Sequence, residues 1–162
     1  MKKAIITGSF DPITAGHIDL VRRAAMIFDE VVVAVLSNAE KSGMFSPDER
    51  LELCNAAVSS IDGASAVLCE GLTSDAAHKV GAKFIVRGAR SATDFDYEYE
   101  LSNIMKRFDP EFETIVLPAS PELSMISSTY VRELVKYGCE LKGSVPDECL
   151  PILERLIKEK KR

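Results

Sequence analysis

The sequence predicts an α/β fold in which a five-stranded parallel sheet carries helices on both of its faces. The chain has 162 residues, a length that suits one compact domain over residues 1–162. Short apolar runs alternate with longer amphipathic ones, the pattern of a parallel sheet with right-handed crossovers. Residues 31–36 read VVVAVL, and such a β-branched run is typical of a strand that is covered on both faces.

Five short apolar runs are the predicted strands. They cover residues 3–7, 31–36, 64–69, 83–87 and 114–117. Ligands of such sheets bind outside the carboxyl ends of the strands, so we expect the loops that follow the strands to share one functional edge. Those loops begin at Gly8, Ser37, Gly71, Gly88 and Pro118.

Amphipathic segments between and after the strands are the predicted helices. They cover residues 17–28, a segment from 47 through 57, 74–80, 95–108, 128–137 and 147–160. The second helix has the clearest start, because Ser46 is a good N-cap, Pro47 suits the first helical position and Glu49 completes a capping box. Gly138 suits the position just after the fifth helix.

The bulk composition excludes several classes of function. The formal net charge is -5, so no broad basic field draws the chain onto nucleic acid or an anionic membrane. No stretch approaches the roughly 20 apolar residues of a membrane span, and the apolar run after Met1 is too short for a signal peptide. We therefore expect a cytoplasmic protein without a nucleic-acid or membrane partner.

The cysteines and histidines do not predict a zinc site. The 4 cysteines form no C-x-x-C pair, and the chain has 2 histidines. Cys54 and Cys69 stand in apolar contexts that favour buried thiols. This usage agrees with a reducing compartment.

The segment that carries chemistry joins the first strand to the first helix. Residues 8–17 read GSFDPITAGH, with glycines near both ends, so that backbone N–H groups and a helix N-terminus can approach an anion. The segment is neither a P-loop nor a dinucleotide-binding glycine motif. His17 opens the helix, where a neutral imidazole can donate a hydrogen bond to a phosphoryl oxygen, although such a histidine can also merely cap or pack.

Separate motifs along the chain carry a family resemblance. Residues 8–17 resemble the first motif of the nucleotidyltransferase superfamily with a [T/H]-x-G-H turn, and residues 126–132 (ISSTYVR) resemble its second signature, I-S-S-T-x-x-[R/K]. Residues 87–90 (RGAR) followed by 94–100 (DFDYEYE) look like a segment of the bacterial phosphopantetheine adenylyltransferase family, and so does Lys41 before MFS. The resemblance covers essentially the whole chain.

The resemblance implies a Rossmann-like nucleotidyltransferase fold and a specific reaction. Members of this family reversibly transfer the adenylyl group of ATP to 4′-phosphopantetheine, giving dephospho-coenzyme A and pyrophosphate in coenzyme A biosynthesis. It also implies a homohexamer and the use of Mg²⁺. We expect the Mg²⁺ to travel on the ATP phosphates, so no metal ligand is assigned, and Asp11 is only a weak candidate.

The family match also implies roles for single residues. His17 resembles the catalytic histidine that stabilises the transition state at the α-phosphate. Contacts with phosphopantetheine are implied for Ser9, Lys41, Thr73 and Arg87. Contacts with ATP are implied for Ser9, Phe10, His17, Gly88, Ala89, Arg90, Glu98, Leu123, Ser124, Met125, Ile126, Ser127, Ser128 and Thr129.

The chemistry of the reaction agrees with these residue types. The attacking phosphate is already anionic, so no strong base is needed, and catalysis depends on positioning and on neutralising charge. Cations and hydrogen-bond donors are therefore expected in place of a Ser-His-Asp set. A few focused cations can form such a pocket within an acidic protein.

Simpler interpretations of single residues stay open. Lys41 could be solvated, Arg87 could pair with Asp94, and Glu98 could lie on a solvated helix face. The hydroxyl residues at 127–129 could act only as helix caps.

Two alternative functions also stay open. Nicotinate mononucleotide adenylyltransferases and glycerol-phosphate cytidylyltransferases share the first motif but use other acceptors, and the segments at 87–90 and 94–98 argue against them. A non-catalytic nucleotide-binding module would bind ATP without turnover. The intact His17 and the intact second signature argue against such a module.

Overall fold

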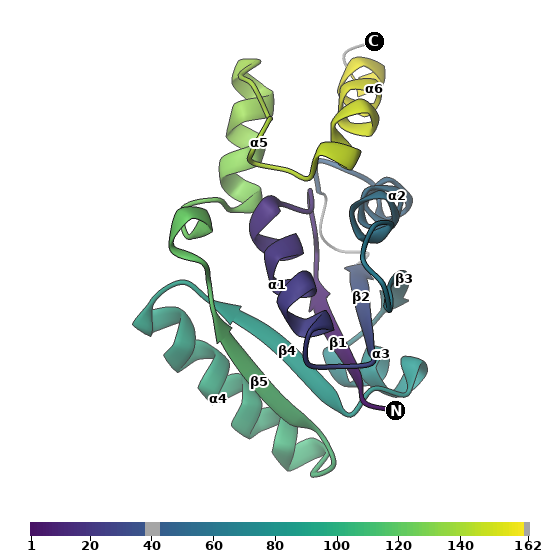
Figure 1. The fold of residues 1–162 in the computed structure, drawn as a ribbon, viewed down its shortest axis with the longest axis vertical. Helices are drawn as coiled ribbons and strands as arrows, with labels where there is room; N and C mark the ends of the chain where they lie inside the picture. The colour runs from purple at the N-terminus through teal and green to yellow at the C-terminus, as the bar shows by residue number, and fades with distance from the viewer. Residues whose placement is uncertain (38–42, 161–162) are drawn as a thin grey trace.

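In the computed structural model, which describes residues 1–37 and 43–160, strands and helices alternate along the chain (Figure 1). The strands are β1 (Lys3–Gly8), β2 (Glu30–Ser37), β3 (Ala64–Glu70), β4 (Phe84–Ala89) and β5 (Glu113–Pro118). The α-helices are α1 (Ala15–Ala25), α2 (Pro47–Val58), α3 (Thr73–Val80), α4 (Ala92–Phe108), α5 (Ser128–Tyr137) and α6 (Leu150–Lys160). Two 3₁₀ turns, η1 (Pro121–Leu123) and η2 (Asp147–Cys149), precede α5 and α6.

The strands form one 5-stranded sheet in the order β3-β2-β1-β4-β5. All four strand pairings are parallel, as predicted. At the centre, Ile5 of β1 pairs with Val32 of β2 on one side and with Ile85 of β4 on the other. The chain moves outward from β1 to β3 and then returns to the other side of β1, so the strand order reverses between β1 and β4. This reversal point is where parallel sheets bind ligands.

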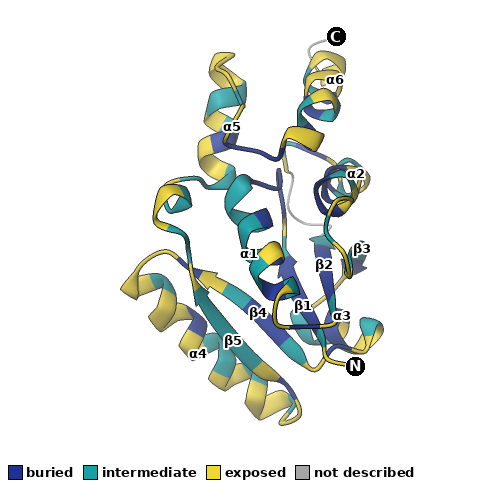
Figure 2. Ribbon diagram, viewed as in Figure 1, coloured by how far each residue is buried: buried dark blue, intermediate teal, exposed yellow. Residues whose placement is uncertain are grey.

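Alternating side chains of the strands build a core on each face of the sheet. On one face, Ile6 and Val33 belong to the same cluster as Val21 of α1 and Leu53 of α2. On the other face, Ile5 clusters with the alanines of α3 and with Met105 of α4. Burial in Figure 2 follows this arrangement, because the central strands are buried while the outer sides of the helices are exposed. Helices therefore cover both faces, which confirms the predicted fold.

Capping side chains explain where the helix boundaries differ from the sequence expectations. The Thr14 side chain accepts from the His17 N–H, so α1 begins before residue 17. The Ser91 hydroxyl accepts from the Asp94 N–H at 3.1 Å, so α4 begins three residues before the expected 95. The last predicted helix, over residues 147–160, consists of the 3₁₀ turn η2 followed by α6. The sequence pattern did not distinguish that turn from α-helix.

Two expected signals stand where they were predicted. The Ser46 hydroxyl accepts from the Glu49 N–H at 3.2 Å, while the Glu49 carboxylate accepts from the Ser46 N–H at 2.6 Å, which is a complete capping box. Gly138 ends α5 with a left-handed φ of 67°.

Burial and hydropathy complete the description. Cys54 and Cys69 are buried, as expected, and Cys149 is buried as well. None of the helices in the described part of the chain is both long enough and apolar enough to cross a membrane.

Candidate active site

A cavity of about 450 Å³ opens at the carboxyl ends of β1 and β4, where the strand order reverses. Its lining comes from the loop after β1, the start of α1, the end of β4, α4, and the segment before α5. Most of the residues implied to contact ATP thus converge on one place, although they are spread from Ser9 to Ser128 in the sequence. The lining members of that set are Ser9, Phe10, His17, Gly88, Arg90, Glu98, Leu123, Ile126, Ser127 and Ser128.

The floor of the cavity is shaped by Phe10. Phe10 is buried and has a left-handed φ of 46°, a conformation that costs an L-residue about 1–2 kcal/mol. The ring lies against Gly8, where an added Cβ would meet the ring at 3.1 Å. It also meets the imidazole of His17 edge-on, with ring centroids 5.0 Å apart and an interplanar angle of 79°. Gly8 and Phe10 therefore fit together, and the aromatic edge supports His17.

His17 takes part in the capping of its own helix. The Thr14 N–H donates to Nδ1 of His17 at 3.0 Å, and the Thr14 hydroxyl lies 3.0 Å from the same nitrogen. Because Nδ1 accepts a hydrogen bond from a backbone amide, the proton of the neutral ring is on Nε2. The hydrogen bonds among the described residues leave Nε2 without an acceptor, and the side chain lines the cavity. The capping role and the donor role proposed from the sequence are thus compatible.

The charge state of His17 follows from its surroundings. Burial, and to a smaller extent the positive charges of Arg90 and Arg87, together lower its pKa from 6.5 to about 4. The imidazole is therefore neutral at physiological pH. A neutral ring with its proton on Nε2 can donate one hydrogen bond to a phosphoryl oxygen.

Arg87 and Glu98 form a bidentate ion pair at the edge of the cavity. Arg87 donates from Nε to Glu98 at 2.8 Å and from a terminal nitrogen at 2.9 Å. Its other terminal nitrogen donates to the carbonyl and the hydroxyl of Thr7 at 3.1 and 3.2 Å. Glu98 is the only residue that is buried in α4, so the interpretation of Glu98 as a solvated surface charge was wrong. The suggested pairing of Arg87 with Asp94 was also wrong, because Glu98 holds Arg87.

Arg90 remains more open to solvent. Asp94 accepts from the Arg90 backbone N–H at 3.0 Å and from its Nε at 3.3 Å. The arginine side chain is 48% exposed, and it lines the cavity beside His17. Asp94 thus holds the guanidinium at Nε, and the two terminal nitrogens have no hydrogen-bond partner among the described residues.

The segment with the second signature lies against the start of α1. An added Cβ on Gly16 would approach the carbonyl oxygens of Ile126 and Leu123 at 3.6 and 3.7 Å. Ser127 is the N-cap of α5, and Ser128 donates to the Pro12 carbonyl at 2.8 Å. Ser127 therefore caps the helix and at the same time lines the cavity, so capping does not exclude ligand binding.

A second cavity of about 490 Å³ lies on the far side of the Arg87–Glu98 pair. Thr73 lines this cavity, and its hydroxyl lies 3.1 Å from that of Thr7. The remaining wall is mostly apolar and consists of one stripe of α4 with neighbouring side chains of α3, β4 and β5. Its apolar members are Leu72, Ile85, Leu101, Ile104, Met105 and Phe108. Arg87 and Glu98 line both cavities and form the wall between them.

Several residues singled out in the sequence do not line either cavity. Ala89, Ser124, Met125 and Thr129 do not belong to the linings. The Ala89 carbonyl accepts from the Ala119 N–H at 2.8 Å, and Met125 is 83% exposed. The Thr129 hydroxyl accepts from Arg132 at 2.9 Å. Lys41 lies outside the described residues.

The acidic residues near the cavity already have partners. Asp19 accepts from the Ser120 hydroxyl at 2.8 Å, and Asp94 and Glu98 accept from arginines. Asp11 accepts from two backbone N–H groups, those of Met44 and Phe45, each at 2.8 Å. Among residues 1–37 and 43–160 no group of three His, Cys, Asp or Glu side chains could hold a metal ion. The carboxylate of Asp11 is thus engaged by the backbone, and Asp11 lines neither cavity.

Sequence reasoning missed part of both linings. Thr14, Asp19 and Arg23 line the first cavity, and of these only Thr14 belongs to a quoted motif. The residues of α4 in the second cavity, Leu101, Ile104, Met105 and Phe108, follow helical spacing. That spacing is visible in the sequence, but it indicates an apolar face without showing whether the face meets a core or a ligand.

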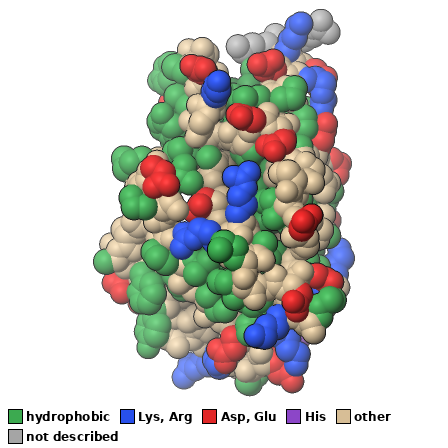
Figure 3. All heavy atoms as spheres, viewed as in Figure 1, with side chains coloured by type: hydrophobic (Ala, Val, Ile, Leu, Met, Phe, Trp, Pro, Cys, Tyr) green, Lys and Arg blue, Asp and Glu red, His purple; other side chains and the backbone are tan. Residues whose placement is uncertain are grey.

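The face of the molecule shown in Figure 3 mixes charges of both signs with hydrophobic side chains. Two groups of basic side chains lie near its middle, without a continuous basic stripe. This agrees with the acidic net charge of -5 and with cations that are confined to small regions.

Comparisons with known proteins identify the family. Residues 5–134 match the cytidylyltransferase-like family. A phosphopantetheine adenylyltransferase of Lachnoclostridium phytofermentans is 40% identical over 153 residues, 94% of each chain. The phosphopantetheine adenylyltransferase of Leptospira biflexa is 42% identical over 144 residues, which are 89% of this chain and 90% of the relative. That of Bdellovibrio bacteriovorus is 40% identical over 158 residues, which are 98% of this chain and 99% of the relative. Such identity over nearly the full length places the chain in the phosphopantetheine adenylyltransferase family of nucleotidyltransferases.

Proposed function

We propose that this chain transfers the adenylyl group of ATP to 4′-phosphopantetheine, producing dephospho-coenzyme A and pyrophosphate. The names of its relatives support the reaction. The observation that carries the proposal is the pair of cavities on either side of Arg87 and Glu98. A reaction that joins a nucleotide to an acceptor with a long, mostly apolar arm needs two adjoining sites of different character.

The polar cavity suits MgATP as a substrate. We assign His17 to the α-phosphate, where its Nε2–H donates to an oxygen that gains negative charge in the transition state. Arg90 and the N-terminus of α1 add positive potential on the same side. Mg²⁺ enters with the phosphates of ATP, because the nearby carboxylates already have partners.

The apolar cavity suits the pantetheine arm. We assign its phosphate to the junction of the cavities, at Arg87, which lines both, with Ser9 on the side of the first cavity. The family resemblance implies Lys41 as a further contact of this phosphate. The phosphate then attacks the α-phosphorus in line, and pyrophosphate leaves on the opposite side. The attacking oxygen carries its own negative charge, so the chain needs to align and neutralise the reactants and no strong base is required.

Assembly and location are also part of the proposal. We assign a homohexamer and a cytoplasmic location, as the family resemblance implies. Large side chains along α4 support an assembly, since Phe95, Tyr97, Tyr99 and Phe108 are each more than half exposed. Light scattering on the purified chain tests this: a hexameric mass supports the assignment, and a monomeric mass contradicts it.

The acceptor decides the function. Purified protein with MgATP should release pyrophosphate when 4′-phosphopantetheine is added, and the product should have the mass of dephospho-coenzyme A. Nicotinate mononucleotide and glycerol phosphate are the matched alternative acceptors and should give only background release. Turnover with either of these but not with phosphopantetheine would refute the proposal, and ATP binding without any turnover would identify a non-catalytic module.

A further inference from the structure

Arg50, on the first turn of α2, is the one buried Lys or Arg among the described residues, with 7% of its surface exposed. It pairs with no carboxylate among those residues. Instead, a terminal nitrogen of its guanidinium donates to the Ser9 carbonyl at 2.8 Å and, less closely, to the Leu36 carbonyl at 3.4 Å. Arg50 therefore connects α2 to the loop that lines the nucleotide cavity.

Packing alone does not account for this side chain. A buried cation without a counter-ion loses much of its solvation, and carbonyl oxygens restore only part of it. Its Nε is buried and has no hydrogen-bond partner among the described residues. An apolar side chain would fill the same space without these costs. The arrangement is explained if the hydrogen bond to Ser9 serves a purpose in the loop.

The Ser9 carbonyl belongs to the peptide that sets the backbone of Phe10. Phe10 has a φ of 46°, which L side chains rarely adopt, so the peptide before it needs to be held from outside. With that peptide in place, the Phe10 ring lies against Gly8 and meets the His17 ring at 5.0 Å. A chain of direct contacts therefore runs from Arg50 through Ser9 and Phe10 to the imidazole.

The other side of the loop is held independently of Arg50. Arg132 donates to the Asp11 carbonyl at 2.8 Å, and the Asp11 carboxylate accepts from the backbone amides of Met44 and Phe45. Loss of Arg50 should therefore release the peptide next to Phe10 and leave the rest of the loop anchored. Such a local release affects geometry more than folding.

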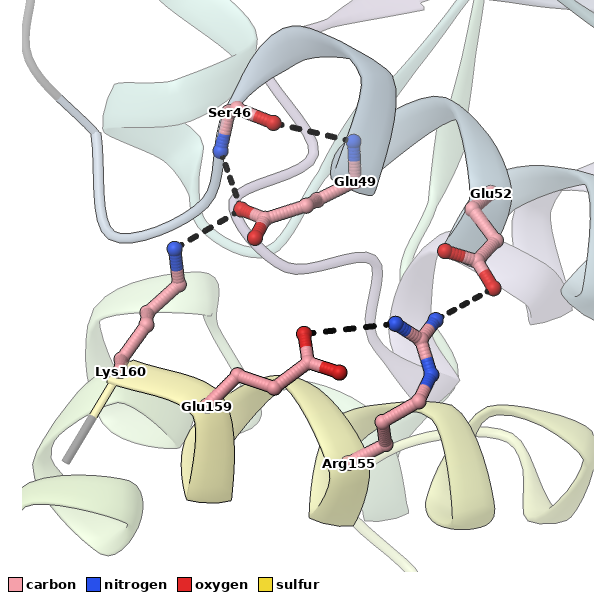
Figure 4. A network of polar contacts seen from close by, with 6 residues as sticks. All are labelled: Ser46, Glu49, Glu52, Arg155, Glu159 and Lys160. Atoms are coloured by element: carbon pink, nitrogen blue, oxygen red, sulfur yellow. Dashed lines mark hydrogen bonds and ion pairs between the residues drawn. The ribbon is translucent and has the colours of Figure 1, made fainter. Parts of the chain in front are cut away.

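Contacts from α6 hold the segment of α2 that carries Arg50. Figure 4 shows Lys160 joined to Glu49 and Arg155 joined to Glu52, on either side of position 50 in α2. The two contacts are 2.9 and 2.6 Å long. Glu49 also completes the capping box with Ser46. The helix thus offers a rigid support for a side chain that reaches into the loop.

We propose that Arg50 is a positioning residue for adenylyl transfer: it holds the Ser9–Phe10 peptide so that Phe10 supports the reactive orientation of His17. This inference rests on the proposed function, because it assigns Arg50 to the same step as His17. Arg50 does not line the cavity. It acts through the loop, and no contact with a substrate is assigned to it.

The test uses Arg50→Met, which keeps much of the length and apolar volume but removes the donors, and Arg50→Lys, which keeps the charge. We expect Arg50→Met to lower kcat by on the order of 10²-fold, because a small misplacement of a catalytic group costs that much. The KM for MgATP should change by less than about threefold, since the substrate contacts remain. Arg50→Lys should recover part of the loss, because an ammonium can still reach a carbonyl.

A double variant separates positioning from general damage. In a His17→Ala background, Arg50→Met should add almost no further loss of kcat, because residues that act as a unit are not additive. Losses that multiply in the double variant would overturn the proposal, and so would an unchanged kcat in Arg50→Met. If Arg50→Met does not fold, the same comparison is made with Arg50→Lys, whose loss of kcat should likewise vanish in the His17→Ala background.

A matched control and the wild type complete the design. Asn55→Ala changes an exposed side chain of α2 that lines neither cavity, and its kcat should stay at the wild-type value. An equal loss of kcat in Asn55→Ala and Arg50→Met would assign the effect to α2 as a whole and overturn the proposal. A wild-type chain without phosphopantetheine-dependent turnover would instead refute the proposed function, so the two failures are distinguishable.

Discussion

The backbone N–H of Thr14 donates to Nδ1 of His17 at 3.0 Å, so the helix cap of α1 also fixes the tautomer of the imidazole that lines the cavity. The proton is left on Nε2, the nitrogen without an acceptor among the described residues. Four expected outcomes depend on this geometry and on the lining of the second cavity.

The first outcome concerns His17→Ala. Removing a single donor aimed at charge that develops in the transition state should lower kcat by ~10²–10³-fold. The KM for MgATP should change little, because the lost bond strengthens only in the transition state. Steady-state pyrophosphate release measures both values. His78→Ala is the control, because that side chain is 63% exposed and lines neither cavity; similar losses in both variants would disprove the assignment.

The second outcome concerns Thr14→Ala. This change removes the hydroxyl that caps α1 but keeps the backbone N–H that binds Nδ1. Loss of an N-cap should lower the free energy of unfolding by about 1 kcal/mol, which urea denaturation measures. Because the tautomer is preserved, kcat should fall much less than in His17→Ala. A loss of kcat as large as that of His17→Ala would show that the hydroxyl, and not the amide, orients the ring.

The third outcome is a pH dependence of stability. The pKa of His17 is lowered from 6.5 to about 4 in the folded chain. Between these values the unfolded state binds more protons, so the folded state loses stability as the pH falls from 6.5 towards 4. The loss reaches on the order of 3 kcal/mol at the acid end. Above about pH 7.5 the ring is neutral in both states and contributes no slope.

Chemical denaturation of wild type and His17→Asn at a series of pH values measures this contribution. The difference in the free energy of unfolding between the two proteins should be constant above about pH 7.5 and should shift in favour of His17→Asn as the pH falls. Parallel curves over the whole range would contradict a lowered pKa.

The fourth outcome concerns the wall of the second cavity. Ile104 lines it and is half exposed. Ile104→Ser should raise the KM for phosphopantetheine several-fold, because a buried apolar contact with a ligand contributes about 1–2 kcal/mol, and it should leave the KM for MgATP unchanged. Ile27→Ser is the matched control, since Ile27 is 52% exposed and lines neither cavity. If Ile104→Ser changed the KM for MgATP as much as the KM for phosphopantetheine, the pantetheine arm would have to bind elsewhere.

The sequence predicted the fold well because its signals are local. The β-branched run of β2 and the capping box at Ser46 and Glu49 depend on neighbours in the chain, and the structure confirms both. The start of α4 was displaced because Ser91 caps it before the first clearly apolar residue, Phe95.

The candidate site was only partly visible in the sequence. The motifs around His17, at 87–98 and at 126–132 gave many of the residues of the first cavity. The pairing of Arg87 with Glu98 could not be inferred from spacing. Whether a glutamate on α4 is buried depends on which face of the helix meets β4, and this is a property of the packed structure. Arg50 belongs to none of the motifs, and its proposed role depends on the carbonyl of Ser9, 41 positions earlier in the chain.

A neutral His17 with its proton on Nε2 is the condition on which the proposed chemistry depends most directly. The chain has 2 histidines, so His78→Asn leaves one imidazole for ¹⁵N NMR. Titration of that variant should give a pKa for His17 of about 4 and, at neutral pH, the nitrogen shifts of the tautomer protonated on Nε2. A pKa near 6.5, or a proton on Nδ1 at neutral pH, would contradict the account.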